Sequence, residues 1–200
     1  MPAILTADQL TKLKADIEVN AHTIDLAGVQ VPIKDTENTP DINHAIANDW
    51  YNIEAEPKFI VWRDLPIRVL GDTILFANFM PKDPIPTDKE LNVAIWSARA
   101  HACHGKQLNL QLLTAGRSIA AMKLTNYRKA LEGCLTNIPA GTGGSLLDAN
   151  WASVFNAAKF PALNIEKLLS SGAGTSAATA DLDFEGKISG DDVTAARDLA

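Results

Sequence analysis

The sequence predicts a mainly α-helical protein: a helical bundle with a few short strands, followed by an extended C-terminal strand and a short capped helix. Apolar residues recur three and four positions apart through most of the chain, which is the spacing of one helix face. Capping boxes, in which a Ser or Thr precedes a Glu, Gln or Asp by three residues, stand at Thr6–Gln9, Thr87–Glu90 and Ser189–Asp192. A hydrophobic content of 46% over 200 residues is sufficient for one core.

The chain is expected to divide into a bundle over residues 1–170 and a C-terminal arm over 171–200. Residues 57–86 interrupt the bundle as an irregular, extended insertion, because three of the ten prolines fall within Met80–Pro86. The arm begins with a stretch rich in Gly, Ser, Thr and Ala, a composition typical of linkers.

In the N-terminal third, the first capping box predicts a helix over 7–20, with Leu10, Leu13 and Ile17 on its apolar face. Residues 21–38 are expected to form a loop, in which Val29–Ile33 is at most an edge strand because Pro32 lacks an N–H. Pro40 in the first turn after a capping Thr predicts the second helix, over 40–52.

Two short extended segments, over 57–63 and 67–70, are predicted from their aromatic and β-branched residues. A third helix over 88–104 should end at Gly105, and it carries one apolar face. The members of that face are Leu91, Ala94, Ile95, Ala98 and Ala102. Further helices are expected over 125–135, 148–158 and 162–169.

The last thirty residues have two alternative interpretations. Asp181, Asp183, Glu185 and Asp192 fall at the first, third, fifth and twelfth positions of an EF-hand or dockerin-like calcium loop. Alternatively, Asp181–Glu185 forms a half-buried strand and Asp192 caps a helix that begins at Ser189. The second interpretation is favoured, because no helix enters the loop and Asp reaches less far than the usual Glu at the twelfth position.

Under that interpretation the apolar side chains of the arm make an intermolecular contact. They are Leu182, Phe184, Ile188 and Val193. An added strand would bind through main-chain hydrogen bonds, with the apolar side chains fixing its register. Trp62 and Arg63, near a proline turn, form a second predicted interface, since Trp and Arg are enriched in such surfaces.

Composition limits the functional classes. With 18 Lys and Arg against 24 Asp and Glu, the formal charge is −6, without a basic block, which does not favour sequence-specific nucleic-acid binding. No apolar run approaches the ~20 residues that span a bilayer. Only two cysteines and the absence of a signal peptide after Met1 predict a reduced, cytoplasmic origin.

Candidate chemistry is sparse. His101, Cys103, His104 and the distant Cys134 lack the paired spacing of structural zinc sites, so buried thiols and surface imidazoles are expected. Gly141–Ser145 resembles a phosphate loop without its Lys and is interpreted as a linker. No catalytic triad is recognisable. We therefore expect no enzymatic activity, no cofactor and no metal, with a small zinc enzyme and a calcium-binding module as alternatives.

Several stretches resemble a family of tailed-bacteriophage and prophage virion proteins from the head–tail joining region. They are Phe59–Arg63, Phe76–Phe79, Ala102–Gln111, Leu135–Gly144, Ile165–Leu169 and Gly172–Gly186, together with Asp192-Val193 and Ala196-Arg197. The resemblance covers most of residues 58–200. It implies a structural virion protein rather than an enzyme.

Head-to-tail adaptors of this kind are small helical bundles that form a ring beneath the portal protein. The resemblance implies a homo-oligomeric ring of twelve subunits that contacts the portal and the tail or neck proteins and leaves room for DNA to pass. It also implies synthesis in the host cytoplasm and a final location at the head–tail interface of the virion. A tail terminator, a head decoration protein and a tail-tube subunit are the alternatives within the same class.

Overall fold

A computed structural model describes residues 5–73, 90–136 and 152–199. The chain forms two compact units: unit 1 comprises Met1–Val61 and Phe160–Ala200, and unit 2 comprises Trp62–Lys159. This division replaces the predicted one at residue 170, because the C-terminal thirty residues belong to unit 1 together with the N-terminus. The mainly α-helical class with short strands agrees with the prediction.

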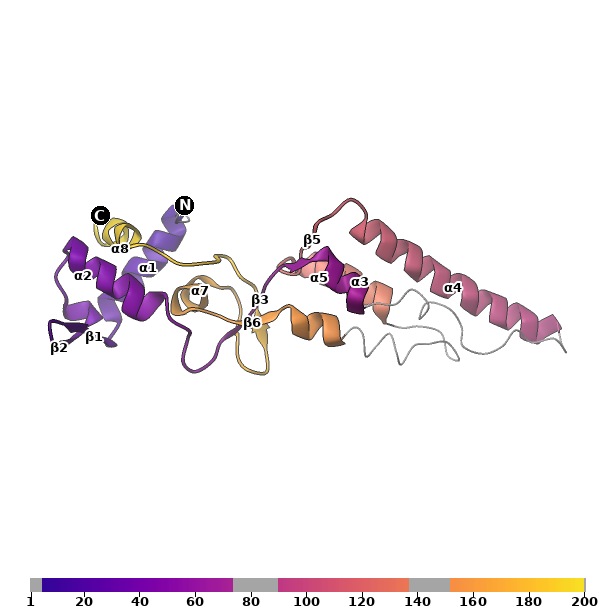
Figure 1. Ribbon diagram of the computed structural model, residues 1–200, viewed down its shortest axis with the longest axis horizontal. Coiled ribbons are helices and arrows are strands. Elements are labelled where there is room, and N and C mark those ends of the chain that lie inside the picture. The colour runs from indigo at the N-terminus through magenta and orange to yellow at the C-terminus, as the bar shows by residue number, and fades with distance from the viewer. Residues whose placement is uncertain (1–4, 74–89, 137–151, 200) are drawn as a thin grey trace. The chain divides into compact units, whose positions relative to one another are not determined.

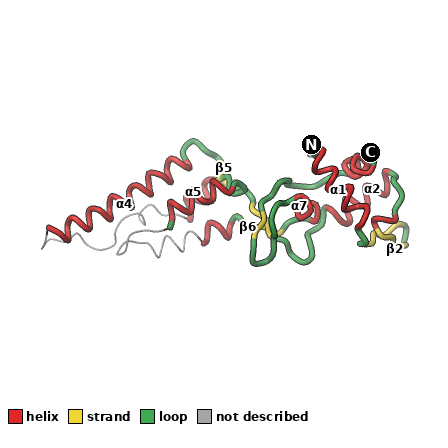
Figure 2. Tube along the Cα trace, turned by 180° about the vertical axis from the view of Figure 1, so that it is seen from behind, coloured by secondary structure: helices red, strands yellow, loops and turns green. Residues whose placement is uncertain are grey.

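Four helices build most of unit 1: α1 (Ala7–Val19), α2 (Pro40–Ile46), α7 (Asn164–Leu169) and α8 (Gly190–Arg197). Helix α2 continues into a π-helical turn, η2 (Ala47–Tyr51). Although they come from opposite ends of the chain, α1 and α8 lie side by side (Figures 1 and 2). Both of their predicted capping boxes are confirmed.

The cap of α1 pairs Thr6 with Gln9: the Thr6 Oγ1 accepts a hydrogen bond from the Gln9 N–H, and the Gln9 Oε1 accepts one from the Thr6 N–H. The cap of α8 pairs Ser189 with Asp192 in the same reciprocal way. These contacts satisfy backbone N–H groups that have no partner within the helix.

Unit 1 also contains a hairpin that the sequence did not predict. Strands β1 (Thr23–Leu26) and β2 (Val29–Pro32) pair antiparallel, and a 3-10 turn, η1 (Ile33–Asp35), follows. Ala27 and Gly28 join the strands with φ of 56° and 86°, the left-handed pair that tight two-residue hairpin loops require.

A three-stranded sheet has the order β6-β3-β7, formed by β3 (Ile60–Trp62), β6 (Lys159–Pro161) and β7 (Thr179–Ala180). β3 and β7 pair in parallel, with Ile60 opposite Thr179 and Val61 opposite Ala180. The predicted strand at Leu182–Phe184 is therefore wrong: the pairing lies a few residues earlier in the chain.

The predicted C-terminal arm is instead part of the core of unit 1. Phe184, Ile188 and Val193 are 7%, 4% and 0% exposed and pack with apolar residues of α1, α2 and α7. Leu182 packs partly buried against a second cluster that contains Phe59 and Val61. Full burial of a large apolar side chain stabilises a fold by roughly 1.5–3 kcal/mol. That gain favours internal packing of this segment over a free arm.

Unit 2 contains β4 (Leu65–Pro66), α3 (Ile67–Thr73), α4 (Glu90–Thr114), β5 (Ile119–Ala120), α5 (Thr125–Leu135) and a helix over 152–157. β4 and β5 pair antiparallel. Of the predicted insertion 57–86, residues 74–86 lie outside the described part. Residues 67–70 are helical and not extended, and α4 continues through Gly105 to Thr114.

The inward face of α4 differs from its apolar sequence stripe. Cys103 and Leu110 are buried in unit 2, whereas Ala94, Ile95 and Ala98 are exposed. Ile95 retains 42% of its accessible surface. Within the described residues, no helix combines the length and the hydropathy needed to cross a membrane.

Candidate functional site

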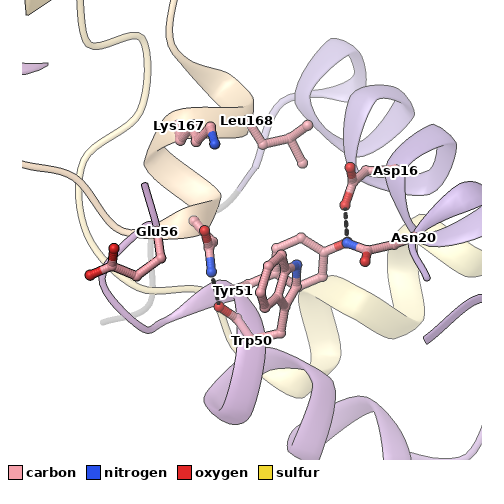
Figure 3. A pocket seen from close by; sticks show the side chains of 8 residues that line it. Asp16, Asn20, Trp50, Tyr51, Glu56, Lys167 and Leu168 are labelled. Carbon is pink, nitrogen blue, oxygen red and sulfur yellow. Dashed lines mark hydrogen bonds between the residues drawn. The ribbon is translucent and has the colours of Figure 1, made fainter. Parts of the chain in front are cut away.

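A pocket of unit 1 opens among α1, η2 and α7 and has a volume of about 320 Å³ (Figure 3). Its lining combines carboxylates, amides, an ammonium group and an indole ring. The lining residues are Asp16, Asn20, Trp50, Tyr51, Glu56, Asn164, Lys167 and Leu168. Such a mixture is suited to binding a polar group rather than an apolar ligand.

One wall of this pocket is held by a shared carboxylate oxygen. The Tyr51 hydroxyl donates a hydrogen bond of 2.7 Å to the Asp16 Oδ2, and the Asn20 Nδ2 donates one of 2.8 Å to the same atom (Figure 3). Burial, reinforced by the charge of Asp16, raises the pKa of Tyr51 well above its ordinary value. Tyr51 therefore remains a protonated donor and orients the carboxylate.

Trp50, which also lines the pocket, is held by two contacts. The imidazole ring of His22 stacks on the indole of Trp50 with 3.8 Å between centroids and an interplanar angle of 23°. The Asn164 Nδ2 donates to the Trp50 carbonyl oxygen over 2.9 Å, which ties α7 to η2. The lining also includes the exposed Glu56 and Lys167.

Three of the four acids of the predicted calcium loop have separate structural contacts. The Asp192 Oδ2 accepts hydrogen bonds from both the N–H and the Oγ of Ser189, each 2.7 Å long. Asp181 exchanges backbone hydrogen bonds with Ser171, and the Asp183 Oδ1 lies 3.4 Å from the Ser171 Oγ. In the part of the chain that the structure describes, no three His, Cys, Asp or Glu side chains are grouped to hold a metal ion.

Two buried polar residues, Asn52 and Glu166, anchor the C-terminal segment, and neither was predicted from the sequence. The Asn52 side chain exchanges two hydrogen bonds with the backbone of Ile188. Glu166, which is 0% exposed, accepts hydrogen bonds of 2.9 Å from the N–H groups of Leu163 and Gly186. Because their partners lie up to 136 residues away, local spacing could not reveal these contacts.

The predicted interface at Trp62 and Arg63 is wrong for Trp62, which lies in the core of unit 2. Trp62 is 8% exposed and meets the Phe155 ring edge-on at a centroid distance of 5.3 Å. The guanidinium of Arg128 lies 4.6 Å from the centroid of the Trp62 ring. Arg63 is half-buried, and its backbone N–H donates to the Ala158 carbonyl oxygen.

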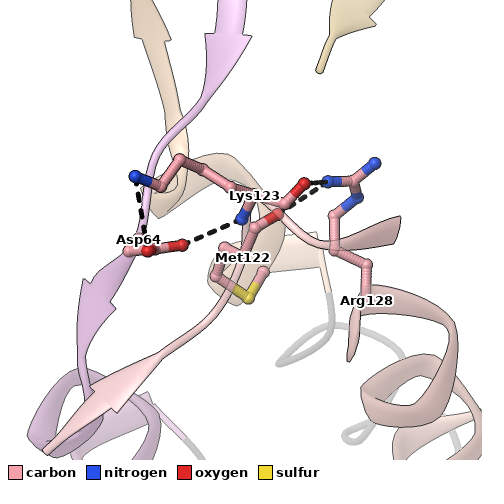
Figure 4. A network of polar contacts seen from close by, with 4 residues as sticks. All are labelled: Asp64, Met122, Lys123 and Arg128. Atoms are coloured by element: carbon pink, nitrogen blue, oxygen red, sulfur yellow. Dashed lines mark hydrogen bonds and ion pairs between the residues drawn. The ribbon is translucent and has the colours of Figure 1, made fainter. Parts of the chain in front are cut away.

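Arg128 is the centre of a polar network in unit 2 (Figure 4). Its Nη1 donates to the carbonyl oxygens of Met122 and Lys123 over 2.7 and 2.9 Å, and its Nη2 donates to the Thr125 Oγ1 over 3.0 Å. The Asp64 carboxylate accepts a hydrogen bond from the Lys123 N–H and lies 3.6 Å from its Nζ. This network fixes the turn between β5 and α5.

Both cysteines are buried thiols of unit 2 that form no disulfide, and His101 and His104 are exposed, as predicted from the sequence. Burial raises the pKa of the Cys134 thiol, an effect that nearby Lys106 partly opposes. A raised pKa lowers the thiolate fraction at neutral pH and therefore the nucleophilicity of Cys134. The predicted linker at Gly141–Ser145 lies outside the described residues.

No family model, curated protein or solved structure matches this chain. Some of the stretches on which the predicted resemblance to phage virion proteins depends lie in helices and strands. Phe59–Arg63 contains β3, Ile165–Leu169 lies within α7, and Asp192-Val193 and Ala196-Arg197 lie within α8, whereas Gly172–Gly186 is mostly without regular structure. Phe76–Phe79 and most of Leu135–Gly144 lie outside the described residues.

Proposed function

We propose that this chain is a structural protein of a tailed-phage virion, and specifically a head-to-tail adaptor that forms a ring between the portal and the tail. The observation that carries the proposal is the position of the resembling stretches. β3, α7 and α8 hold much of the core of unit 1, in which Val61, Ile165 and Val193 are fully buried. Resemblance in core elements supports a shared framework rather than a shared surface motif.

The proposed partners are further copies of the same chain in a ring of twelve, the portal protein on one side and a tail or neck protein on the other. DNA passes through the ring without sequence-specific recognition. The protein is made in the host cytoplasm and incorporated at the head–tail interface. It has no catalytic role and needs no cofactor.

Other virion roles are less well supported. Tail tubes and tail terminators are usually built from sheets, whereas the longest strands described here have four residues. This argument is an analogy at the level of fold. The calcium-binding alternative has no supporting geometry, because Asp192 is engaged by Ser189 and the other acids do not converge with it.

Electron microscopy of assembled particles tests the proposal. The chain, carrying an epitope tag, is expressed while particles of the same genome assemble, and the assembled particles are imaged after antibody labelling. We expect label at a single vertex and a mass increment of twelve chains per portal. Label distributed over the capsid would identify a decoration protein, and label along the tail would identify a tube subunit. Absence from particles that are otherwise complete would refute a virion role.

A further inference from the structure

The outer edge of β5 in unit 2 carries unused backbone hydrogen-bonding groups. Leu65 pairs with Ala120 and Pro66 with Ile119, and the Ile67 N–H donates to the Ser118 carbonyl oxygen. Hydrogen-bonded and non-hydrogen-bonded pairs alternate in an antiparallel ladder. The Pro66–Ile119 pair is therefore non-bonded, which also suits a proline, since it has no N–H to donate.

It follows that the N–H and C=O of Ile119 point away from β4. No hydrogen bond from the described residues reaches either group. A strand edge with a free N–H and C=O pair is a template for another extended segment. Burying such groups without a partner costs free energy, so an added strand is favoured over a loose apolar cover.

The segments that flank β5 carry exposed apolar and basic side chains. Ile119 and Leu124 are 52% and 62% exposed, and Leu112, at the end of α4, is 76% exposed. Exposed apolar side chains therefore stand in β5 itself and on both sides of it along the chain. The edge can therefore hold apolar side chains of a partner as well as its backbone.

Arg68, Arg117 and Lys129 are exposed cations on segments that adjoin this sheet: α3, which contacts β5, the turn before β5, and α5, which follows it. Arg117 precedes β5 by two residues, Arg68 follows β4 by two, and Lys129 lies in the second turn of α5. None of the three has an ion pair with a described residue. Unit 2 as a whole contains 11 Lys and Arg and 7 Asp and Glu, so its formal charge is +4 in a chain whose total is −6.

We propose that the outer edge of β5 docks an extended protein segment in which apolar residues alternate with Asp or Glu. The backbone of the segment pairs with the N–H and C=O of Ile119, its apolar side chains contact Ile119 and Leu124, and its carboxylates pair with Arg68, Arg117 and Lys129. Complementary charge selects the acidic segment over a neutral or basic one. The proposal does not depend on the virion role.

The test uses the full-length chain labelled with ¹⁵N and a blocked octapeptide in which Val alternates with Asp and Glu. A second octapeptide, with Lys and Arg in place of the acids, is the matched ligand control. We expect saturable shifts of the Ile119 amide resonance with the acidic peptide, and an affinity about tenfold higher than for the basic peptide at low salt. Equal affinity for both peptides, or no shift at Ile119, would overturn the proposal.

Two pairs of variants distinguish the contribution of the Ile119 backbone to peptide binding from that of the charged side chains. Ile119→Pro removes the outward N–H and leaves the ladder with β4 intact, whereas Ile119→Thr keeps the N–H and serves as its control. Arg117→Glu should weaken binding of the acidic peptide. Lys12→Glu makes the same charge change on the exposed face of α1 and should leave that binding unchanged. If Ile119→Pro fails to fold, the affinity of Arg117→Glu for the acidic peptide still tests the proposal. Unchanged binding by Arg117→Glu contradicts the proposal.

A single-stranded oligothymidylate is added in a separate titration, because exposed cations also attract phosphates. We expect it to leave the Ile119 amide unshifted, since a phosphate backbone cannot pair with a strand edge. Shifts at Ile119 with the oligonucleotide and none with the peptide would assign the edge to nucleic acid and overturn the proposal.

Discussion

The Asn52 side chain binds the backbone of Ile188 as a neighbouring strand would. Its Nδ2 donates to the Ile188 carbonyl oxygen over 2.8 Å, and its Oδ1 accepts from the Ile188 N–H over 2.9 Å. Ile188 lies in a segment without regular structure, so no backbone partner is available for these groups nearby. One amide therefore satisfies two buried backbone groups and fixes the C-terminal segment to η2.

Asn52→Ala should lower the free energy of unfolding by about 2–4 kcal/mol, because it leaves both Ile188 groups buried without partners. Urea unfolding followed by far-UV circular dichroism measures the change. Asn109→Ala, at an exposed position of α4, is the control and should change stability by less than about 0.5 kcal/mol.

Truncation after Ser171 should unfold unit 1. The deletion removes Phe184, Ile188, Val193 and Ala196 from its core. At roughly 1.5–3 kcal/mol for each large side chain, the loss approaches the total stability of a small domain. Amide NMR spectra should show collapsed dispersion for residues of α1 and α2. A dispersed spectrum for those helices would restore the independent-arm interpretation.

Stability at alkaline pH should depend on Tyr51. Its pKa is raised in the folded state by burial and by Asp16, so its contribution is complete below the unfolded pKa of about 10 and is lost as pH rises beyond it. Urea midpoints measured between pH 8 and 11.5 should fall in the wild-type chain. Tyr51→Phe should be less stable at neutral pH, by about 1 kcal/mol for the lost hydrogen bond, with a shallower alkaline decline. If the urea midpoints of the wild-type chain and of Tyr51→Phe fell equally steeply with pH, the alkaline loss of stability would not be due to Tyr51.

Arg128→Ala should destabilise unit 2 by about 2–4 kcal/mol. It removes hydrogen bonds to Met122, Lys123 and Thr125 and exposes a face of Trp62. Tryptophan fluorescence during urea unfolding reports the change. Lys129→Ala alters the adjacent exposed cation and is the matched control. Equal effects of the two substitutions would mean that the network does not stabilise the unit.

Most of the helices were predictable, because their signals are local. Thr6 with Gln9 and Ser189 with Asp192 cap helices wherever the rest of the chain lies. The hairpin was missed because Ala27 adopts a positive φ that is usual for Gly or Asn. Gly105 did not end α4, because burial of Cys103 and Leu110 on either side outweighs a helix cost of about 1 kcal/mol for glycine.

The alternation of Leu182 and Phe184 had a different cause from the expected one. The two side chains point into separate apolar clusters, one with Phe59 and Val61 and the other with α1 and α2. Leu182 and Phe184 are therefore both apolar because each packs into a different cluster, and not because they share the buried face of a strand. The pocket at Tyr51 was not predictable, since Asp16, Tyr51 and Asn164 meet only after α1, η2 and α7 have packed.

Because unit 1 combines segments that precede and follow unit 2, its completion depends on the order of synthesis. The first 61 residues emerge from the ribosome long before residues 160–200, which supply α7, α8 and β7. All of unit 2 is translated in the interval, so it can fold first, as domains generally fold as units during synthesis. The N-terminal segment must meanwhile remain soluble without its core partners, and a nascent chain halted near residue 160 should protect unit 2 alone from protease.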